Sequence, residues 1–172
     1  MVKIVVGVCG SVAAVRVPEM VRELKRRGID VECVMSASAR NIIHPNVLEW
    51  ASERKVTTEL TGAVEHVRLL GVAGEAKLLL VCPATSNTIG KIACGIDDTP
   101  VTTCAATALG SGIPVVIVPA MHVSMYYNPI VVENIKKLKK QGIIFIDPEI
   151  DENKAKLPEQ EAIIEKILEV LG

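Results

Sequence analysis

The sequence predicts a single-domain α/β protein whose parallel sheet is doubly wound, with helices on both faces. Short apolar runs alternate with amphipathic segments along the 172 residues, as in chains built from βα units. The run from Lys3 to Val8 is short and rich in β-branched residues, which is typical of a strand that is buried on both faces. No internal repeat or low-complexity segment divides the chain.

The expected strands are short runs rich in aliphatic and β-branched residues. They cover residues 3–8, 31–35, 78–82, 114–118 and 143–146. The segments between them carry apolar residues at helical spacing. The expected helices cover residues 12–27, 37–42, 46–51, 87–94, 101–110, 129–140 and 159–171. In a sheet of this class, ligands bind beyond the carboxyl ends of the strands, so the loops that leave those ends are the candidate site.

The first strand ends in a turn of small residues, Cys-Gly-Ser-Val-Ala-Ala, at positions 9–14. The later glycines of the G-x-G-x-x-G dinucleotide fingerprint are missing, so the turn does not predict a nicotinamide site. A small-residue turn between a strand and a helix suits a mononucleotide phosphate instead. Ser36 follows the second strand directly and is therefore expected at the same edge of the sheet.

The third strand is followed by Pro-Ala-Thr-Ser-Asn-Thr at positions 83–88, just before a helical pattern. The first N–H groups of a helix lack partners, and the helix dipole favours negative charge there. Hydroxyl side chains at this place either cap the helix or hold a phosphate. The residues alone leave both interpretations open.

The fourth strand is followed by a loop, residues 118–129, that contains two methionines, a histidine and two tyrosines. Such a loop either packs as a connection with buried methionine, a common filler of irregular gaps, or lines a ligand site. The residues by themselves do not decide between these interpretations.

Composition argues against several functional classes. The formal net charge of −1 gives no reason to expect nucleic acid or a membrane surface as partner, and 2% aromatic residues argue against base stacking. No apolar run is long enough to span a bilayer, and no signal peptide opens the chain. The five cysteines are dispersed without a C-x-x-C pair, so we expect no metal site and a cytoplasmic location.

Three motifs together are similar to a known family: Gly-Ser-Val-Ala-Ala, Pro-Ala-Thr-Ser-Asn-Thr and Pro-Ala-Met-His-x-x-Met. They resemble the signatures of the flavoprotein superfamily of homo-oligomeric flavin-containing cysteine decarboxylases. That superfamily includes phosphopantothenoylcysteine and peptidyl-cysteine decarboxylases, flavin prenyltransferases, archaeoflavoproteins and dihydromethanopterin reductase. The resemblance runs from about Lys3 to about Gly142. It implies one FMN-binding domain over residues 1–172 with a Rossmann-like flavoprotein fold.

The resemblance also implies where FMN binds and which side chains move protons. The expected FMN-binding residues are Gly10, Ser11, Val12, Ser36, Thr85, Ser86, Asn87, Thr88, Thr103 and Met121. His66 matches the active-site base of the decarboxylase relatives in type and context, although an ordinary exposed histidine is the alternative. His122 stands where the decarboxylases carry asparagine. We expect both histidines near the flavin ring, His66 for proton transfer and His122 as a hydrogen-bond donor.

The C-terminal region departs from the phosphopantothenoylcysteine enzymes, which carry a substrate clamp with a reactive cysteine and a Gly-x-Gly-Arg-Met run. Residues 147–159 contain neither, and no cysteine lies beyond Cys104. We therefore expect the clamp to be absent. The favoured function is then a redox flavoprotein that passes electrons between a donor, such as ferredoxin, and an acceptor.

The alternative function is FMN-dependent decarboxylation of a small cysteinyl substrate of the phosphopantothenoylcysteine type. Prenyl transfer ranks last, because no basic cluster for a prenyl phosphate is evident. The hydrophobic content of 49% and the low net charge also predict a homo-oligomer, with the flavin near an interface that includes the loop from Met121 to Asn128.

Overall fold

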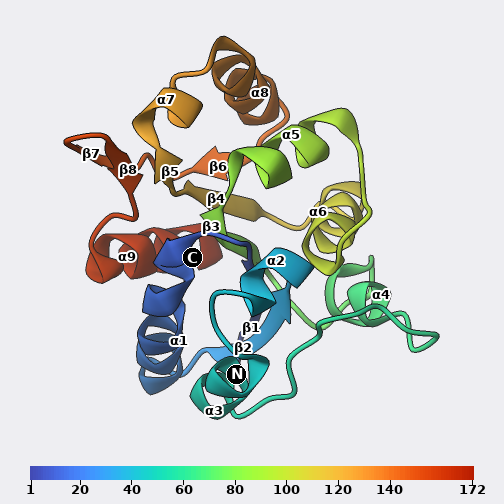
Figure 1. Cartoon of the computed structure of the whole chain (residues 1–172). Coiled ribbons are helices and arrows are strands. Elements are labelled where there is room, and N and C mark those ends of the chain that lie inside the picture. The colour runs from blue at the N-terminus through green and yellow to red at the C-terminus, as the bar shows by residue number, and fades with distance from the viewer.

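A parallel sheet of five strands forms the centre of the protein, in the order β2-β1-β3-β4-β6 (Figure 1). The computed structural model describes residues 1–172. The strands are β1 (Lys3–Val8), β2 (Asp30–Met35), β3 (Leu79–Ala84), β4 (Val115–Pro119) and β6 (Ile144–Phe145). The chain moves from β1 to β2 on one side and then crosses to β3 on the other side of β1. The carboxyl ends of β1 and β3 therefore flank a topological switch point, where sheets of this class bind ligands.

Helices cover both faces of this sheet, and each face buries its own apolar cluster. Successive residues of β1 alternate between the clusters: Ile4 and Val6 face one, and Val5 faces the other. In Figure 1, α1 and α9 lie on one side of the sheet, and α5, α6 and α8 lie on the other. This arrangement confirms the predicted fold class. The helices are η1 (Val12–Arg16, a 3-10 helix), α1 (Val17–Arg26), α2 (Ala37–Arg40), α3 (Pro45–Ser52), α4 (Glu65–Leu70), α5 (Ser86–Cys94), α6 (Pro100–Gly110), α7 (Val123–Tyr126), α8 (Pro129–Lys140) and α9 (Gln160–Leu171).

Three helices differ from the sequence-based expectation, and one of them, α7, falls in the loop expected over residues 118–129. The single helix expected over residues 12–27 is divided into η1 and α1, and Pro18 lies in the first turn of α1. Proline has no N–H and is therefore best placed in the first turn of a helix, where that donor has no partner to lose. Helix α4 was not expected at all. It begins after Val64, which has a left-handed φ of 46°, and no side chain caps it.

A second, smaller sheet was also not expected. It is antiparallel, in the order β5-β8-β7, and consists of β5 (Met121–His122), β7 (Glu149–Asp151) and β8 (Lys154–Lys156). Met121 pairs with Ala155 and His122 with Lys154. The chain that follows β6 thus folds back, as the hairpin β7–β8, onto the loop that leaves β4 (Figure 1). The region in which the cysteine and the glycines of the clamp are missing is thus folded as a hairpin.

Hydrophobic helices of membrane-spanning length do not occur in this structure. None of its helices combines the length and the apolar character needed to cross a bilayer.

Candidate active site

The loops after β1, β2 and β3 meet at the switch point. The Cys9 amide donates to the Pro83 carbonyl at 3.3 Å, and the Thr88 hydroxyl donates to the Cys9 sulfur at 3.3 Å. Gly10 lies against the loop after β2, since a Cβ atom at this position would stand 2.5 Å from the Cβ of Ser38. A larger residue would push these loops apart. The structure thus brings together most of the residues that the sequence assigned to a phosphate and its polyol chain.

Three hydroxyl side chains of this cluster act as helix caps. Ser11 accepts from the Ala13 amide, Ser36 from the Ala39 amide and Thr85 from the Thr88 amide, at 3.3, 3.2 and 3.2 Å. Capping fixes the position of each hydroxyl and leaves the neighbouring first-turn N–H groups directed outward. The side chains of Ser86 and Asn87 make no hydrogen bond within the chain. The cluster therefore combines fixed hydroxyls with uncommitted donors.

A cavity of about 370 Å³ lies beside the Ser11 loop. Three segments form it: the loop and helix η1, the strand β5 with the residue before it, and the hairpin strand β8. Its floor is apolar and buried, with Ala120 and Ala155 exposed by 3% and 2%. The cavity is lined by Ser11, Val12, Ala13, Val15, Arg16, Ala120, Met121, His122, Lys154, Ala155, Lys156 and Leu157.

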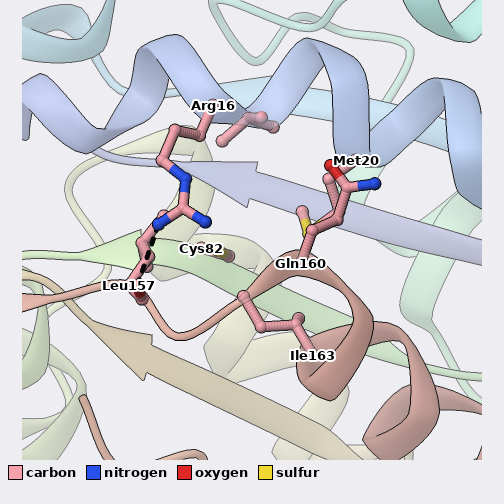
Figure 2. A pocket seen from close by; sticks show the side chains of 7 residues that line it. Arg16, Met20, Cys82, Leu157, Gln160 and Ile163 are labelled. Carbon is pink, nitrogen blue, oxygen red and sulfur yellow. Dashed lines mark hydrogen bonds between the residues drawn. The ribbon is translucent and has the colours of Figure 1, made fainter. Parts of the chain in front are cut away.

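Arg16 attaches the hairpin to this cavity. Its guanidinium donates to the carbonyl of Leu157 at 2.8 Å and to that of Pro158 at 3.1 Å. Figure 2 shows the side chain reaching down to Leu157, over a small void of about 10 Å³ next to Cys82. No carboxylate pairs with Arg16, so its charge is compensated only by backbone dipoles. The return of the chain from β8 to α9 is therefore fixed to the same helix that borders the Ser11 loop.

His122 faces the cavity in a defined orientation. Its Nδ1 accepts from the Ser124 amide at 3.2 Å and lies 2.8 Å from the Ser124 hydroxyl. A ring nitrogen that accepts from an amide carries no proton, so in the neutral ring the proton resides on Nε2. His122 can thus donate one hydrogen bond from Nε2 to a group in the cavity.

His66 lies elsewhere. It belongs to α4, which packs against α6, and it does not line the cavity that holds His122. In Figure 1, α4 and β5 are well separated. The Nδ1 atom of His66 is buried and has no hydrogen-bond partner. One chain therefore does not bring together the two histidines that the sequence assigned to one flavin ring.

The helix that carries His66 is held by charged groups. Arg68 pairs with Glu32 of β2, whose side chain is 9% exposed, and with Glu75 at 3.1 Å. At the start of α4, hydrogen bonds from the hydroxyl and the amide of Thr61 lower the pKa of Glu65 to about 2. These contacts fix α4 against the edge of the main sheet and leave the His66 ring half-buried.

Thr103 is also separated from the cavity. Its hydroxyl donates to the Asp97 carbonyl at 2.7 Å, and it lines another hollow together with Ala37 and Arg40. Ala37 follows Ser36 directly, so this hollow lies next to the loop after β2. The structure thus places Thr103 beside one end of the predicted FMN-binding residues and Met121 beside another.

Comparison with known proteins places these features in a family. The sequence profile of the Flavoprotein family matches residues 1–172. The chain belongs to the Flavoprotein family. It is 52% identical over 170 residues to the coenzyme A biosynthesis bifunctional protein CoaBC of Thermococcus kodakarensis, covering 98% of this chain and 42% of that protein. The chain thus spans less than half the length of this bifunctional relative.

Other relatives of this flavoprotein match along their whole length. A probable phosphopantothenoylcysteine decarboxylase of Streptococcus mutans is 33% identical over 180 residues, which cover 98% of each protein. The solved structure of SpaF, described as an FMN-dependent cysteine decarboxylase, is 30% identical with a TM-score of 0.84, covering 100% of this chain and 98% of SpaF. The peptidyl-cysteine decarboxylase EpiD is 27% identical with a TM-score of 0.85, covering 98% of this chain and 99% of EpiD.

These relatives correct the functional expectation and confirm the family. The prediction of an electron-transfer flavoprotein is wrong, because the relatives are named for cysteine decarboxylation and coenzyme A biosynthesis. That prediction gave too much weight to the missing cysteine and glycines of residues 147–159. The segment still folds as a hairpin next to β5, although its side chains differ. The resemblance to flavin-containing cysteine decarboxylases is confirmed, and with it the prediction of FMN as cofactor.

The residues of this flavoprotein fit FMN. The close approach at Gly10 leaves no room for a side chain, and the hydroxyl and amide groups at the switch point are neutral donors suited to a phosphate and a ribityl chain. A carboxylate would repel a phosphate, and none lines the adjoining cavity. Ser11, Val12, Met121 and the Thr85–Thr88 segment are therefore the parts of the chain that suit this cofactor.

The buried cysteines of this flavoprotein are thiols and not thiolates. Burial raises the pKa of Cys9 to about 11 and that of Cys33, Cys82 and Cys104 to about 12. These thiols stay protonated near neutral pH and are poor nucleophiles. Cys94 is exposed, at the end of α5. None of the cysteines lines the cavity next to β8.

Sequence reasoning missed three cationic side chains of the cavity: Arg16, Lys154 and Lys156. A signal for the lysines was available. Residues 149–156 alternate polar and apolar side chains on both sides of Glu152 and Asn153, which is a hairpin pattern. For Arg16 there was no signal, because its partners are backbone carbonyls more than a hundred residues away.

Proposed function

We propose that this chain catalyses the FMN-dependent decarboxylation of a small cysteinyl substrate of the phosphopantothenoylcysteine type. The observation that carries the proposal is the cavity between the Ser11 loop and the hairpin β7–β8, which gives a cysteinyl substrate a place next to the predicted flavin site. The relatives support the same reaction, since one is a probable phosphopantothenoylcysteine decarboxylase that matches over its whole length.

The residues of the switch point would hold the cofactor. Gly10, Ser11 and the Thr85–Thr88 segment offer backbone and hydroxyl donors without competing negative charge. Met121 and Val12 would give the cavity side an apolar lining. When bound, FMN supplies reversible two-electron chemistry at the cysteinyl carbon and sulfur. The protein's own contribution is to orient the substrate, exclude water and place proton-transfer groups.

His122 would act as a hydrogen-bond donor. Because Nδ1 is occupied by the Ser124 amide, the Nε2–H group points to a single kind of partner, an acceptor oxygen in the cavity. A substrate carboxylate or a carbonyl of the cofactor provides such an oxygen. This assignment also explains how an imidazole can serve at the position where related decarboxylases carry asparagine.

His66 would act as the proton-transfer group, and a second copy of the chain would bring it to the site. Within one chain, α4 and the cavity are apart, and the Nδ1 atom of His66 is buried without a partner. Apolar side chains are exposed near both places. Val12 and Val15 are 76% and 61% exposed beside the cavity, and Val67 is 49% exposed on α4. A homo-oligomer that buries these surfaces would join the two half-sites.

The test is release of CO₂ from phosphopantothenoylcysteine by the FMN-loaded protein, with the product identified by mass spectrometry. We expect turnover by the wild-type chain and loss of about 100-fold or more in the His66→Asn variant, the typical contribution of a general acid or base. FMN content, read from the visible spectrum, should stay unchanged in the variant. A fully flavin-loaded, oligomeric protein that releases no CO₂ would contradict the proposal.

A further inference from the structure

The cavity has a cationic mouth. Arg16, Lys154 and Lys156 line it, and no aspartate or glutamate does. The net charge of the whole chain is −1, so this concentration of positive charge is local. The acidic residues of the hairpin belong to the outer strand β7 and the turn that follows it, outside the lining.

The charges at this mouth are only partly compensated. Asp151 pairs with Lys156, and this contact raises the pKa of the Lys156 amine. Lys154 stands opposite Asp151 in the β7–β8 register, but it makes no ion pair and no hydrogen bond. Arg16 contacts only the carbonyls of Leu157 and Pro158. Two of the three cations therefore have no carboxylate partner.

The two ends of the cavity differ: one is buried and apolar, and the other is exposed and positively charged. Its floor, formed by Ala120, Ala155 and Leu157, is at most 4% exposed, whereas both lysine side chains are exposed. His122 and Lys154 form a direct antiparallel pair, and directly paired residues project from the same face of a sheet. The cavity thus suits a ligand with a neutral body and an anionic end that remains near solvent.

We propose that Lys154, together with Lys156 and Arg16, forms a subsite for the terminal phosphate of the substrate, which makes the hairpin β7–β8 a selectivity element for phosphorylated substrates. The inference rests on the proposed function, because it assigns the substrate of the same cavity. Lysine is an effective point-charge partner for phosphate. Peptide substrates without such a group would gain nothing from these side chains.

The substrate also carries a carboxylate, and the experiment must separate this group from the phosphate. Binding of 4′-phosphopantothenate and of pantothenate to the FMN-loaded protein is measured by calorimetry. The values of kcat/KM for phosphopantothenoylcysteine and pantothenoylcysteine are measured in parallel. Lys154→Gln removes the charge at the mouth. Lys136→Gln is the matched control, since Lys136 is an exposed, unpaired lysine on α8, outside the cavity.

We expect Lys154→Gln to weaken 4′-phosphopantothenate binding about tenfold, the effect of losing one charged hydrogen bond. The affinity for pantothenate should stay unchanged. The preference for the phosphorylated substrate in kcat/KM should fall by the same factor, and added salt should reduce it further in the wild type. The Lys136→Gln variant should retain the full preference.

Three results would overturn the subsite. An equal loss of kcat/KM for phosphopantothenoylcysteine and pantothenoylcysteine would assign Lys154 to the substrate carboxylate. A loss of FMN content would assign Lys154 to the phosphate of the cofactor. No change in either measurement would leave Lys154 a solvated side chain.

Failure of the proposed function looks different. The protein would then release no CO₂ from either substrate, while the calorimetric preference for the phosphorylated ligand would still depend on Lys154.

Discussion

The β5–β8 side of the molecule and the α4 side each carry one of the predicted active-site histidines, but they are built differently. His122 lies on a lined cavity, next to the Ser11 loop, and its ring is oriented by Ser124. His66 lies on a short helix that ion pairs and the Thr61 contacts fix in place, and it does not line the cavity that holds His122. The first side offers a lined cavity, and the second offers a histidine that lies away from it. On the proposed function, each chain would hold one half of each of two different sites.

The largest effect is expected on the cavity side, from Ser11→Asp. Aspartate is as good an N-cap as serine, so η1 should still form. Its negative charge would stand against the phosphate of FMN, and we expect the protein to be purified without flavin. The α4 side should be untouched. Ser11→Asn, which has the same size and no charge, is the control and should retain flavin. Full flavin content in Ser11→Asp, read from the visible spectrum, would remove Ser11 from the cofactor site.

A smaller effect is expected from Arg16→Ala, which loosens the hairpin and also removes one of the three cations that line the cavity. The variant loses two charge-assisted hydrogen bonds to Leu157 and Pro158, so the hairpin should open more readily, by about 1–3 kcal/mol. Faster hydrogen exchange of the Ala155 amide would report this opening. KM should rise more than kcat falls, because the cavity wall moves while the proton-transfer group stays.

Arg22→Ala is the matched control for Arg16. The Arg22 guanidinium lies 4.5 Å from the ring of Trp50, on the surface and away from the hairpin. The Arg22→Ala variant should leave the hydrogen exchange of the Ala155 amide unchanged. Equal exchange in Arg16→Ala and Arg22→Ala would mean that the hairpin is held by its strand pairing with β5 alone.

The smallest effect is expected on the α4 side, from Thr61→Ala. Hydrogen bonds from Thr61 lower the folded-state pKa of Glu65 to about 2, below its ordinary value of 4.5. The stabilisation is therefore complete above pH 4.5 and is lost as the pH falls toward 2. In the variant the pKa of Glu65 should rise toward 4.5, as measured by carboxyl NMR titration. Glu75, which is paired with Lys3 and Arg68, should not shift. An unchanged Glu65 pKa would show that backbone N–H groups, those of Thr61 and Glu65, set it without the hydroxyl.

The same comparison explains what the sequence could predict. The main sheet was predictable because β1, β3 and β4 are mostly apolar runs of five or six residues. The signal is weaker in β2, which contains Asp30 and Glu32, and in the short β6. The loops at Gly10, Ser36 and Thr85 followed from the position of those strands. Strands β5, β7 and β8 are two or three residues long and depend on pairing across the chain. The alternation in residues 149–156 covers only three residues on each side of the turn, so the hairpin was missed although its pattern is present.

Helix α4 escaped prediction for a related reason. It has six residues, no side-chain cap and a left-handed residue at its start. Its partners are distant in the sequence: Leu69 and Leu70 are buried in an apolar cluster, and Arg68 pairs with Glu32. The placement of His66 away from the cavity could not be inferred from motif order, because a motif identifies a residue type and context but not which copy of the chain contributes it. The wrong functional choice came from the weight given to the missing cysteine. The absence of that side chain did not mean that the hairpin itself was absent, because the backbone can pair without it.

The central claim is that the complete site joins the cavity of one copy with His66 of another, and a complementation experiment tests it most directly. Ser11→Asp keeps His66 but should lack flavin, and His66→Asn keeps flavin but lacks the base. The two variants, carrying different tags, are expressed together, and the hybrid oligomers are purified through both tags. Ser11→Asp alone should release no CO₂ from phosphopantothenoylcysteine, and His66→Asn alone should keep about a hundredth of the wild-type rate or less. The hybrids should regain activity. Flavin-containing hybrids that stay inactive would contradict the claim and would place the whole site within one chain.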